Sequence, residues 1–119
     1  MTSIGVDIIE VERIESVIEQ WGERFLNRIY TEAELKICES RISSLAVRFA
    51  AKEAVMKVLG TGTIGVGWRE IEILPDSLGK PLVKLHGRAK SKAEELNLND
   101  FSISLADTKQ IAIATAIGT

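Results

Sequence analysis

Apolar and polar residues alternate at both ends of the chain, as they do in β-strands. Residues 4–9 (IGVDII) predict a half-buried strand in which Asp7 falls on the face opposite the main apolar one. FSISLA and QIAIATAI alternate in the same way and are separated only by DTK, which predicts a hairpin near the C-terminus. EIEIL at residues 70–74 predicts another strand, and the turn residues DSLGKP lead from it into LVKL.

Between the predicted strands, apolar residues recur every three or four positions, as on the buried face of a helix. Residues 10–20 predict one helix, and the capping-box pattern of Thr31 and Glu34 predicts that a short helix starts there. A long helix begins near residues 43–44 and ends at Gly60, which can adopt the left-handed conformation of a C-cap. A polar helix is expected over GRAKSKAEEL. Because the last two strands lie too close together for a crossover helix, the pattern indicates an α+β fold with antiparallel pairing.

The predicted long helix carries four charges that do not fall on one side. They are Arg48, Lys52, Glu53 and Lys57. At about 100° per residue, the core side of this helix is small and apolar, and consists of Val47, Ala50, Ala51, Ala54, Val55 and Val58. The bulky residues Phe49 and Met56 lie among the charges, so something must cover them. The ordinary explanation for the charges is a solvated face in which Glu53 and Lys57 pair at i, i+4.

Composition narrows the classes of function. With 15 basic and 17 acidic residues the net charge is -2, so the chain lacks the basic excess of a nucleic-acid-binding protein, and an anionic partner would have to meet a local basic cluster. No apolar run approaches the about 20 residues of a membrane span, and no basic leader precedes an apolar segment. We therefore expect a soluble, cytoplasmic protein without a membrane partner. The length suits a single domain, residues 1–119.

The ionisable residues indicate which metal chemistry is plausible. A single cysteine and a single histidine argue against a zinc or copper site, and we expect His86 to be an ordinary surface residue. Asp7 and Glu53 supply two carboxylates, while Arg48 and Lys57 supply positive charge. Magnesium prefers one or two carboxylates together with water and phosphate oxygens, so these residues suit a magnesium–phosphate site. The alternative for Asp7 is an exposed edge position of its strand.

A glycine-rich stretch, GTGTIGVG at residues 60–67, directly follows the predicted long helix. Glycines let backbone amides approach a ligand closely, as they do in phosphate-binding loops. The stretch lacks the GK[ST] ending of a P-loop, and a plain turn is the alternative explanation. It therefore indicates a phosphate site only in combination with the neighbouring charges.

Four blocks of sequence together resemble one family. IGVDIIEVERI (residues 4–14), RFAAKEAVMKVLGTG (residues 48–62), GKP (residues 79–81) and SISLADTKQIAIATAI are similar to the motifs of holo-[acyl-carrier-protein] synthases, the small 4'-phosphopantetheinyl transferases. The resemblance covers essentially the whole chain. It implies transfer of the phosphopantetheine arm of coenzyme A to a serine of an apo-acyl carrier protein, with adenosine 3',5'-bisphosphate as the second product. It also implies an antiparallel sheet packed on the long helix, and homotrimers with active sites between subunits.

The resemblance also assigns roles to individual residues. Asp7 and Glu53 match the ligands of the catalytic Mg2+, and Lys57 matches the lysine that faces the phosphates. The general base is left open among Asp7, Glu53 and a bound water. The residues that match coenzyme A contacts are Arg48, for the 3'-phosphate, and Lys57, Gly60, Thr61, Gly62, Lys80, Pro81 and Ser104. Leu105 stands where many members have a histidine, which marks a subtype and leaves the adenine-side contacts open.

The resemblance further implies a docking surface for the acidic carrier protein. Arg13 and Arg24 match the family's carrier-docking arginines, and Arg28 is a third candidate, with a solvated arginine as the alternative. Two other classes of protein stay open. One is a non-catalytic coenzyme A or nucleotide-binding module of the same fold, and the other is a plain trimeric structural protein. Asp7, Glu53 and Lys57 together favour the enzyme. In a trimer, a neighbouring chain and the ligand would cover Phe49 and Met56.

Overall fold

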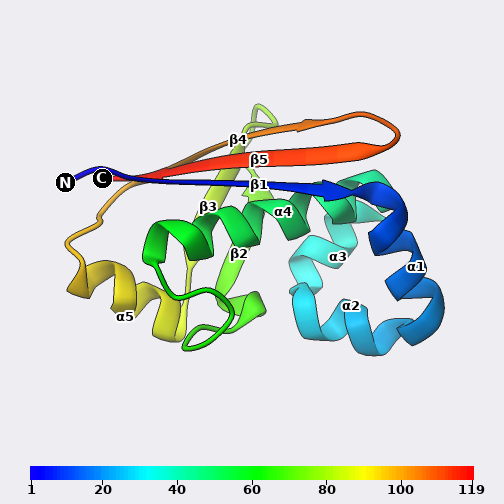
Figure 1. Cartoon of the computed structure of the whole chain (residues 1–119), viewed down its shortest axis with the longest axis horizontal. Helices are drawn as coiled ribbons and strands as arrows, with labels where there is room; N and C mark the ends of the chain where they lie inside the picture. The colour runs from blue at the N-terminus through cyan, green and yellow to red at the C-terminus, as the bar shows by residue number, and fades with distance from the viewer.

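The chain folds around one long central helix, α4, in a computed structural model that describes residues 1–119 (Figure 1). The elements in chain order are β1 (Ser3–Glu10), α1 (Val11–Trp21), α2 (Glu23–Ile29), α3 (Glu32–Cys38), α4 (Ile42–Leu59), the 3-10 helix η1 (Trp68–Glu70), β2 (Ile71–Pro75), β3 (Pro81–Leu85), α5 (Gly87–Glu95), β4 (Phe101–Asp107) and β5 (Ile111–Gly118). All strand pairs are antiparallel, which confirms the predicted α+β class. No helix is both long and apolar enough to cross a membrane.

Two antiparallel sheets lie around α4. The predicted hairpin β4–β5 is confirmed, and β1 pairs along the other side of β5 to give the order β1-β5-β4. The second sheet is the hairpin β2–β3. Figure 1 shows the three-stranded sheet covering one side of α4, with α1, α2 and α3 gathered at one end of the helix and α5 at the other. The sheet therefore brings β1, at the start of the chain, against a helix from its middle.

The core forms where α4 meets the three-stranded sheet. The predicted core side of the helix is buried, and the strand β5 presents Ala112, Ala114 and Ala116 to it, all with no exposed surface. Met56 is also buried, with 1% of its surface exposed, so no neighbouring chain is needed to cover it, contrary to expectation. Phe49 is half-buried and stacks on Trp68, with 4.7 Å between ring centroids. Burial of apolar surface within a single chain thus accounts for Met56, whereas cover of the exposed part of Phe49 by a neighbouring chain or a ligand stays a prediction.

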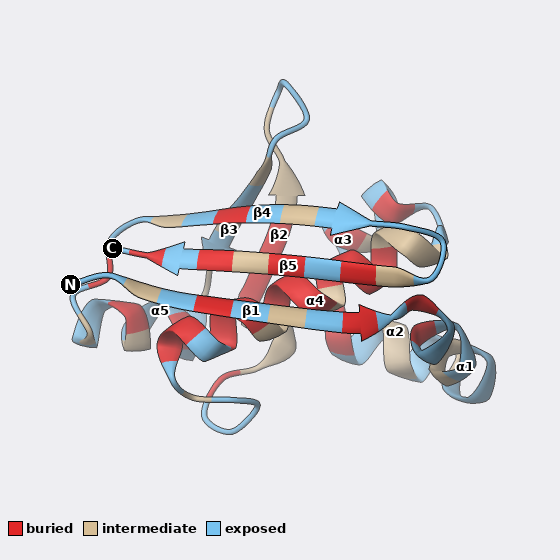
Figure 2. Ribbon diagram, turned by 45° about the horizontal axis from the view of Figure 1, so that its top comes forward, coloured by how far each residue is buried: buried red, intermediate tan, exposed pale blue.

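Strand β1 approaches α4 closely because it has a glycine at the crossing point. A Cβ atom on Gly5 would overlap the carbonyl oxygen of Ala54, so no larger residue fits there without moving the strand. The face of β1 that packs on α4 carries Gly5, Asp7 and Ile9. The predicted position of Asp7 is correct, but the more apolar face points outward. In Figure 2, which looks onto that outer face, exposed and buried residues alternate along the strands. Ile4, Val6 and Ile8 are 70%, 50% and 63% exposed.

The capping box at the start of α3 is confirmed and connects to β2. The Glu34 amide donates to Thr31 Oγ1 at 3.2 Å, and the Thr31 amide donates to Glu34 Oε1 at 2.9 Å. The Thr31 hydroxyl donates to Glu72 Oε2 at 2.6 Å, while His86 Nε2 lies 3.0 Å from Glu72 Oε1. His86 is therefore a partly exposed residue with a specific partner. Glu72 joins α3 to the second sheet.

We expect this connection to make stability depend on pH. Burial raises the pKa of Glu72, but hydrogen bonds from Thr31 and His86 outweigh it, so its pKa lies below the ordinary glutamate value. A depressed folded-state pKa contributes stability that is present above the unfolded-state pKa and lost as pH falls through the folded-state value. In urea unfolding, wild type should be more stable than Glu72→Gln by about 1 kcal/mol at about pH 5.5. This difference should shrink by about pH 3; a constant difference would contradict the assignment.

Candidate functional site

Strand β1 and helix α4 bring three predicted site residues together. Lys57 Nζ donates to the Val6 carbonyl at 2.7 Å and to Asp7 Oδ1 at 3.3 Å. The Asp7 side chain is 14% exposed, so it does not occupy an exposed edge position. Glu53 lies one turn before Lys57 on α4. The close crossing at Gly5 and Ala54 explains the meeting, because Asp7 lies two residues beyond Gly5 on the same face of the strand.

Asp7 and Glu53 are near enough to influence one another's charge. Burial raises the pKa of Glu53, and the Asp7 carboxylate raises it further, while Lys57 and Arg13 lower it. The net direction is upward, so the folded chain disfavours the ionised form of Glu53. Two carboxylates that repel each other in a partly buried site favour the binding of a cation between them.

A small cavity of about 180 Å3 lies between β1, α1, α2 and α4. Asp7 and Glu53 both line it, together with Arg13, Phe25 and Phe49. Arg13, a predicted carrier-docking residue, therefore reaches the same space as the two carboxylates. The cavity supplies an opening with negative and positive side chains beside an apolar wall, which suits a phosphate-bearing ligand accompanied by a cation.

The carboxylates fit magnesium better than a softer metal. No group of three or more His, Cys, Asp and Glu side chains is placed to hold an ion. Structural zinc sites need such a set, whereas magnesium is commonly held by one or two carboxylates and takes its other ligands from water and substrate phosphates. Asp7 and Glu53 therefore fit the role of magnesium ligands that the family resemblance implies.

Arg48 lies away from this cavity and inside the protein. Its Nε donates to the Ile73 carbonyl of β2 at 3.1 Å, and one terminal nitrogen donates to Ser44 Oγ at 2.8 Å. The residue is 8% exposed. The structure thus shows Arg48 holding β2 against α4, and its contact with the 3'-phosphate stays a prediction.

Lys52 is the residue whose role the sequence analysis missed. The solvated-face explanation is wrong for it, because its side chain is fully buried and forms an ion pair with Glu34, with Nζ 2.8 Å from Oε1. The sequence indicates Glu34 only as half of the capping box. The two residues belong to different helices, and no local pattern links them. The signal available was indirect: Lys52 lies beside Ala51 and one turn before Val55 and Met56, all of which are buried.

The glycine-rich loop begins where α4 ends, beside Lys57. Gly60 has a φ of 72° and acts as the left-handed C-cap that the sequence predicts, and the Thr61 amide donates to the Met56 carbonyl at 3.2 Å. Gly62 is exposed and also has a positive φ, of 58°. Residues 60–62 therefore present backbone at the end of the helix that carries Glu53 and Lys57.

The other predicted coenzyme contacts do not line the cavity with Asp7 and Glu53. Lys80 and Pro81 lie at the turn between β2 and β3, where Asp76 Oδ1 accepts a hydrogen bond of 2.9 Å from the Lys80 amide. Ser104 and Leu105 lie on β4, which β5 separates from β1. Within one chain, these residues and the carboxylates are thus in different places.

Two of the three carrier-docking candidates line a groove on α1 and α2 that adjoins the carboxylate cavity, since Val17 and Phe25 line both. Arg24 and Arg28 line it with Val17, Trp21 and Phe25, and its volume is about 520 Å3. Trp21 is 50% exposed, and the Arg24 guanidinium lies 5.8 Å from the centre of its ring. The groove combines two exposed arginines with apolar surface, a composition suited to an acidic, amphipathic partner.

Comparison with known proteins gives consistent matches over the whole chain. Residues 3–116 match the model of the ACPS family, described as the 4'-phosphopantetheinyl transferase superfamily. A protein of Herpetosiphon aurantiacus named holo-[acyl-carrier-protein] synthase is 46% identical, with 99% of this chain and 98% of that protein covered. A protein of the same name from Dehalococcoides mccartyi strain CBDB1 is 48% identical, with 98% of each covered.

Solved structures agree with these sequence matches. The crystal structure of holo-[acyl-carrier-protein] synthase from Neisseria meningitidis has a TM-score of 0.91 at 35% identity and covers 98% of this chain and 97% of its own. The Helicobacter pylori enzyme, in complex with coenzyme A, has a TM-score of 0.88 at 32% identity and covers 98% and 99%. The fold, the motifs and these matches agree from one end of the chain to the other, and the chain belongs to the 4'-phosphopantetheinyl transferase superfamily.

Proposed function

We propose that this chain transfers 4'-phosphopantetheine from coenzyme A to a serine of an apo-acyl carrier protein, releasing adenosine 3',5'-bisphosphate, with Mg2+ as cofactor. The observation that carries the proposal is the meeting of Asp7 with Glu53 and Lys57, which lie on the helix that leads into the glycine-rich loop. It is supported by relatives named holo-[acyl-carrier-protein] synthase and by the coenzyme A complex of the Helicobacter pylori enzyme. A cytoplasmic location stays a prediction.

The reaction asks for little covalent chemistry from the protein. The serine hydroxyl attacks the phosphorus that bears the pantetheine, and the bond from that phosphorus to the bridging oxygen breaks. Magnesium held by Asp7 and Glu53 would neutralise charge on the pyrophosphate. Lys57, half exposed and directed by its bond to the Val6 carbonyl, stabilises charge that develops on the departing phosphate. The serine proton would pass to Glu53, Asp7 or a bound water, the three acceptors that the site offers.

We further propose that the active unit is a homotrimer, as the family resemblance implies. The outer face of the three-stranded sheet is apolar and exposed over two of its strands: Ile4, Val6 and Ile8 on β1 lie beside Ile113 and Ile117 on β5, which are 37% and 40% exposed. A contiguous apolar face of this kind favours association. Association would also complete the coenzyme site, because a second chain can supply Lys80, Pro81 and Ser104 contacts that one chain does not bring to its own carboxylates.

The proposed carrier-docking surface consists of Arg13, Arg24 and Arg28. Arg24 and Arg28 line the groove on α1 and α2, and Arg13 lines the adjoining cavity together with Asp7 and Glu53. A mildly acidic enzyme needs such a local cluster to attract an acidic protein. The arrangement would guide the carrier's serine from the arginines towards Asp7 and Glu53.

Reversing one docking charge should separate carrier binding from coenzyme binding. We expect Arg24→Glu to raise the KM for apo-carrier protein about tenfold or more, with the dissociation constant for coenzyme A unchanged, because the reversal repels an acidic partner at the groove. The matched control is Lys36→Ala, which removes an exposed charge from α3. Carrier titrations in transfer assays and calorimetry with coenzyme A measure the two effects. A weaker affinity for coenzyme A with normal carrier kinetics would refute the assignment.

The function itself is tested by incubating the protein with coenzyme A, magnesium and an apo-acyl carrier protein, and then measuring the mass of the carrier by mass spectrometry. We expect the carrier to gain the mass of one phosphopantetheine. Binding of coenzyme A without an adduct on several carriers would instead support the non-catalytic module. Neither binding nor transfer would support a structural protein.

A further inference from the structure

The glycine-rich loop, residues 60–67, is held at its two ends by different parts of the chain. Its upstream end is the C-terminus of α4, closed by the Gly60 cap. Its downstream end runs into η1, where the Glu70 amide donates to the Gly67 carbonyl at 3.0 Å and the Glu70 carboxylate accepts from the Gly67 amide. Between these ends residues 62–65 are exposed, with Ile64 85% exposed, whereas Val66, next to the downstream end, is buried with 3% of its surface exposed. The position of the loop therefore depends on how each end is anchored.

Lys52 reaches the downstream end from inside the protein. Its Nζ donates to the Trp68 carbonyl at 3.0 Å and to the Ile71 carbonyl at 2.6 Å, one at each end of η1. The third partner is Glu34 Oε1, at 2.8 Å. An ammonium group has three N–H donors, so all of them are used and their directions are fixed by groups from α3, η1 and β2.

Glu34 holds the same junction from the other side. Its Oε2 accepts a hydrogen bond of 2.8 Å from the Ile73 amide, while its Oε1 accepts from Thr31 and Lys52. Both side chains are fully buried. A buried ion pair is often no better for stability than well-packed apolar residues, so stability alone does not explain why these two charges are buried here. An apolar side chain in place of Lys52 would leave the Trp68 and Ile71 carbonyls without this donor.

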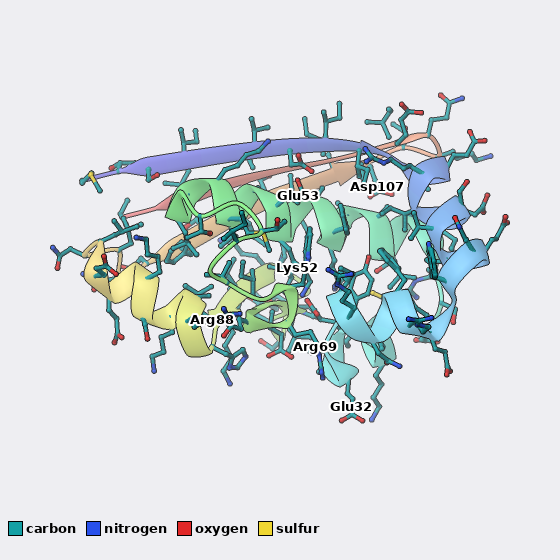
Figure 3. All side chains as sticks on the ribbon, turned by 60° about the horizontal axis from the view of Figure 1, so that its bottom comes forward. Glu32, Lys52, Glu53, Arg69, Arg88 and Asp107 are labelled. Atoms are coloured by element: carbon teal, nitrogen blue, oxygen red, sulfur yellow. The ribbon has the colours of Figure 1, made fainter.

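The geometry couples this anchor to the proposed catalytic residues. Lys52 and Glu53 are consecutive on α4, so their side chains leave the helix about 100° apart. Figure 3 labels both: Glu53 lies on the side of α4 next to the three-stranded sheet, and Lys52 on the side towards α3 and η1. The same turn of α4 therefore places Glu53 next to Asp7 and, through Lys52, holds the downstream end of the glycine-rich loop.

We propose that Lys52, with Glu34 as its buried counter-ion, is a positioning residue that fixes the downstream end of the glycine-rich loop relative to Glu53 and Lys57, and thereby shapes the coenzyme A site. The inference rests on the proposed function and deepens it, because it assigns the loop's position to a residue that touches no substrate. Its prediction is specific to the coenzyme and does not extend to the carrier protein.

The test compares a charge-free variant with a matched control. Lys52→Met/Glu34→Gln removes the pair without leaving a buried charge, and Lys52→Arg keeps the charge but replaces its three-way geometry, which gives a second variant if the first does not fold. The control is Tyr30→Phe. It removes another buried hydrogen bond, from the tyrosine hydroxyl to the Leu45 carbonyl at 2.6 Å, that does not involve the loop.

We expect the KM for coenzyme A to rise about tenfold in the double variant and less in Lys52→Arg, with kcat and the KM for the carrier changed by less than about threefold. Amide hydrogen exchange over residues 61–71 should become at least about tenfold faster while α1 and β5 are unaffected. Tyr30→Phe should alter neither quantity. Unchanged exchange and KM in folded variants would overturn the proposal and show that the Glu70 contacts and the buried Val66 side chain suffice. Should wild type bind no coenzyme A, the proposed function fails, while the exchange measurement still decides the anchoring.

Discussion

Replacing Glu53 by glutamine should reduce the rate of phosphopantetheine transfer about 10²- to 10³-fold while leaving the chain folded. Glutamine has nearly the shape of glutamate but lacks its charge, so it is a poor magnesium ligand and cannot accept the serine proton. Single-turnover assays with coenzyme A, magnesium and apo-carrier protein, followed by mass spectrometry, measure the effect. Glu95→Gln, at an exposed site on α5, is the matched control and should transfer at the wild-type rate.

The stability of Glu53→Gln should not fall with its transfer rate, and so provides a second, independent measurement. Because burial and Asp7 raise the pKa of Glu53 in the folded chain, ionised Glu53 destabilises the fold as pH rises through that pKa. A neutral glutamine removes this repulsion, so the free energy of unfolding at neutral pH should be unchanged or higher. Loss of transfer together with normal or raised stability would identify Glu53 as a functional residue. Full activity in Glu53→Gln would remove the argument for the metal.

A second large loss, of both stability and transfer rate, is expected for Gly5→Ala. This substitution adds one methyl group at a residue far from Glu53 in the sequence. The new Cβ would overlap the Ala54 carbonyl oxygen. This oxygen belongs to the backbone in the middle of a helix, so it cannot move without distorting the helix. Strand β1 must therefore move away from α4. Overpacking of this kind costs about 1–3 kcal/mol of folding free energy. Asp7 moves with the strand, and a displacement of about 1 Å at a reacting centre can lower the rate about 10²-fold.

Gly118, where an added Cβ would meet side-chain atoms and not helix backbone, provides the comparison for Gly5. A Cβ on Gly118 would lie 2.8 Å from Val58 Cγ1 and 3.3 Å from Phe101 Cε2, which are side-chain atoms and not helix backbone, and Gly118 lies on β5 at the end far from Asp7. Urea unfolding and transfer assays should show a smaller loss of stability and near-normal transfer for Gly118→Ala. Wild-type stability and activity in Gly5→Ala would mean that the crossing of β1 and α4 does not position Asp7.

Local patterns in the sequence were enough to predict most elements of this fold. The capping box at Thr31, the left-handed cap at Gly60 and the terminal hairpin each depend on residues only a few positions apart. These features are confirmed because the interactions that define them are local. The family resemblance, which rests on whole motifs, is confirmed by matches along the entire chain.

Interactions between segments far apart in the sequence could not be predicted from local patterns. The pattern could not tell which of the four charges on α4 were buried, because the partners of Arg48 and Lys52 come from α3, η1 and β2. It identified the two faces of β1 but not that the face with Gly5 would pack inward, since that depends on the approach of Ala54. The meeting of Asp7 with Glu53 came from the resemblance and the chemistry of the residues, not from periodicity.

The buried hydroxyl of Tyr30 gives this protein a built-in optical probe. Tyr30 is the only tyrosine in the chain, and burial, reinforced by Cys38 and Glu34, raises the pKa of its hydroxyl well above the usual range. The phenol therefore keeps its proton in alkaline solution for as long as the surrounding helices stay closed. Phenolate absorbance at high pH then reports opening of the helical end of the molecule, without any label attached to the protein.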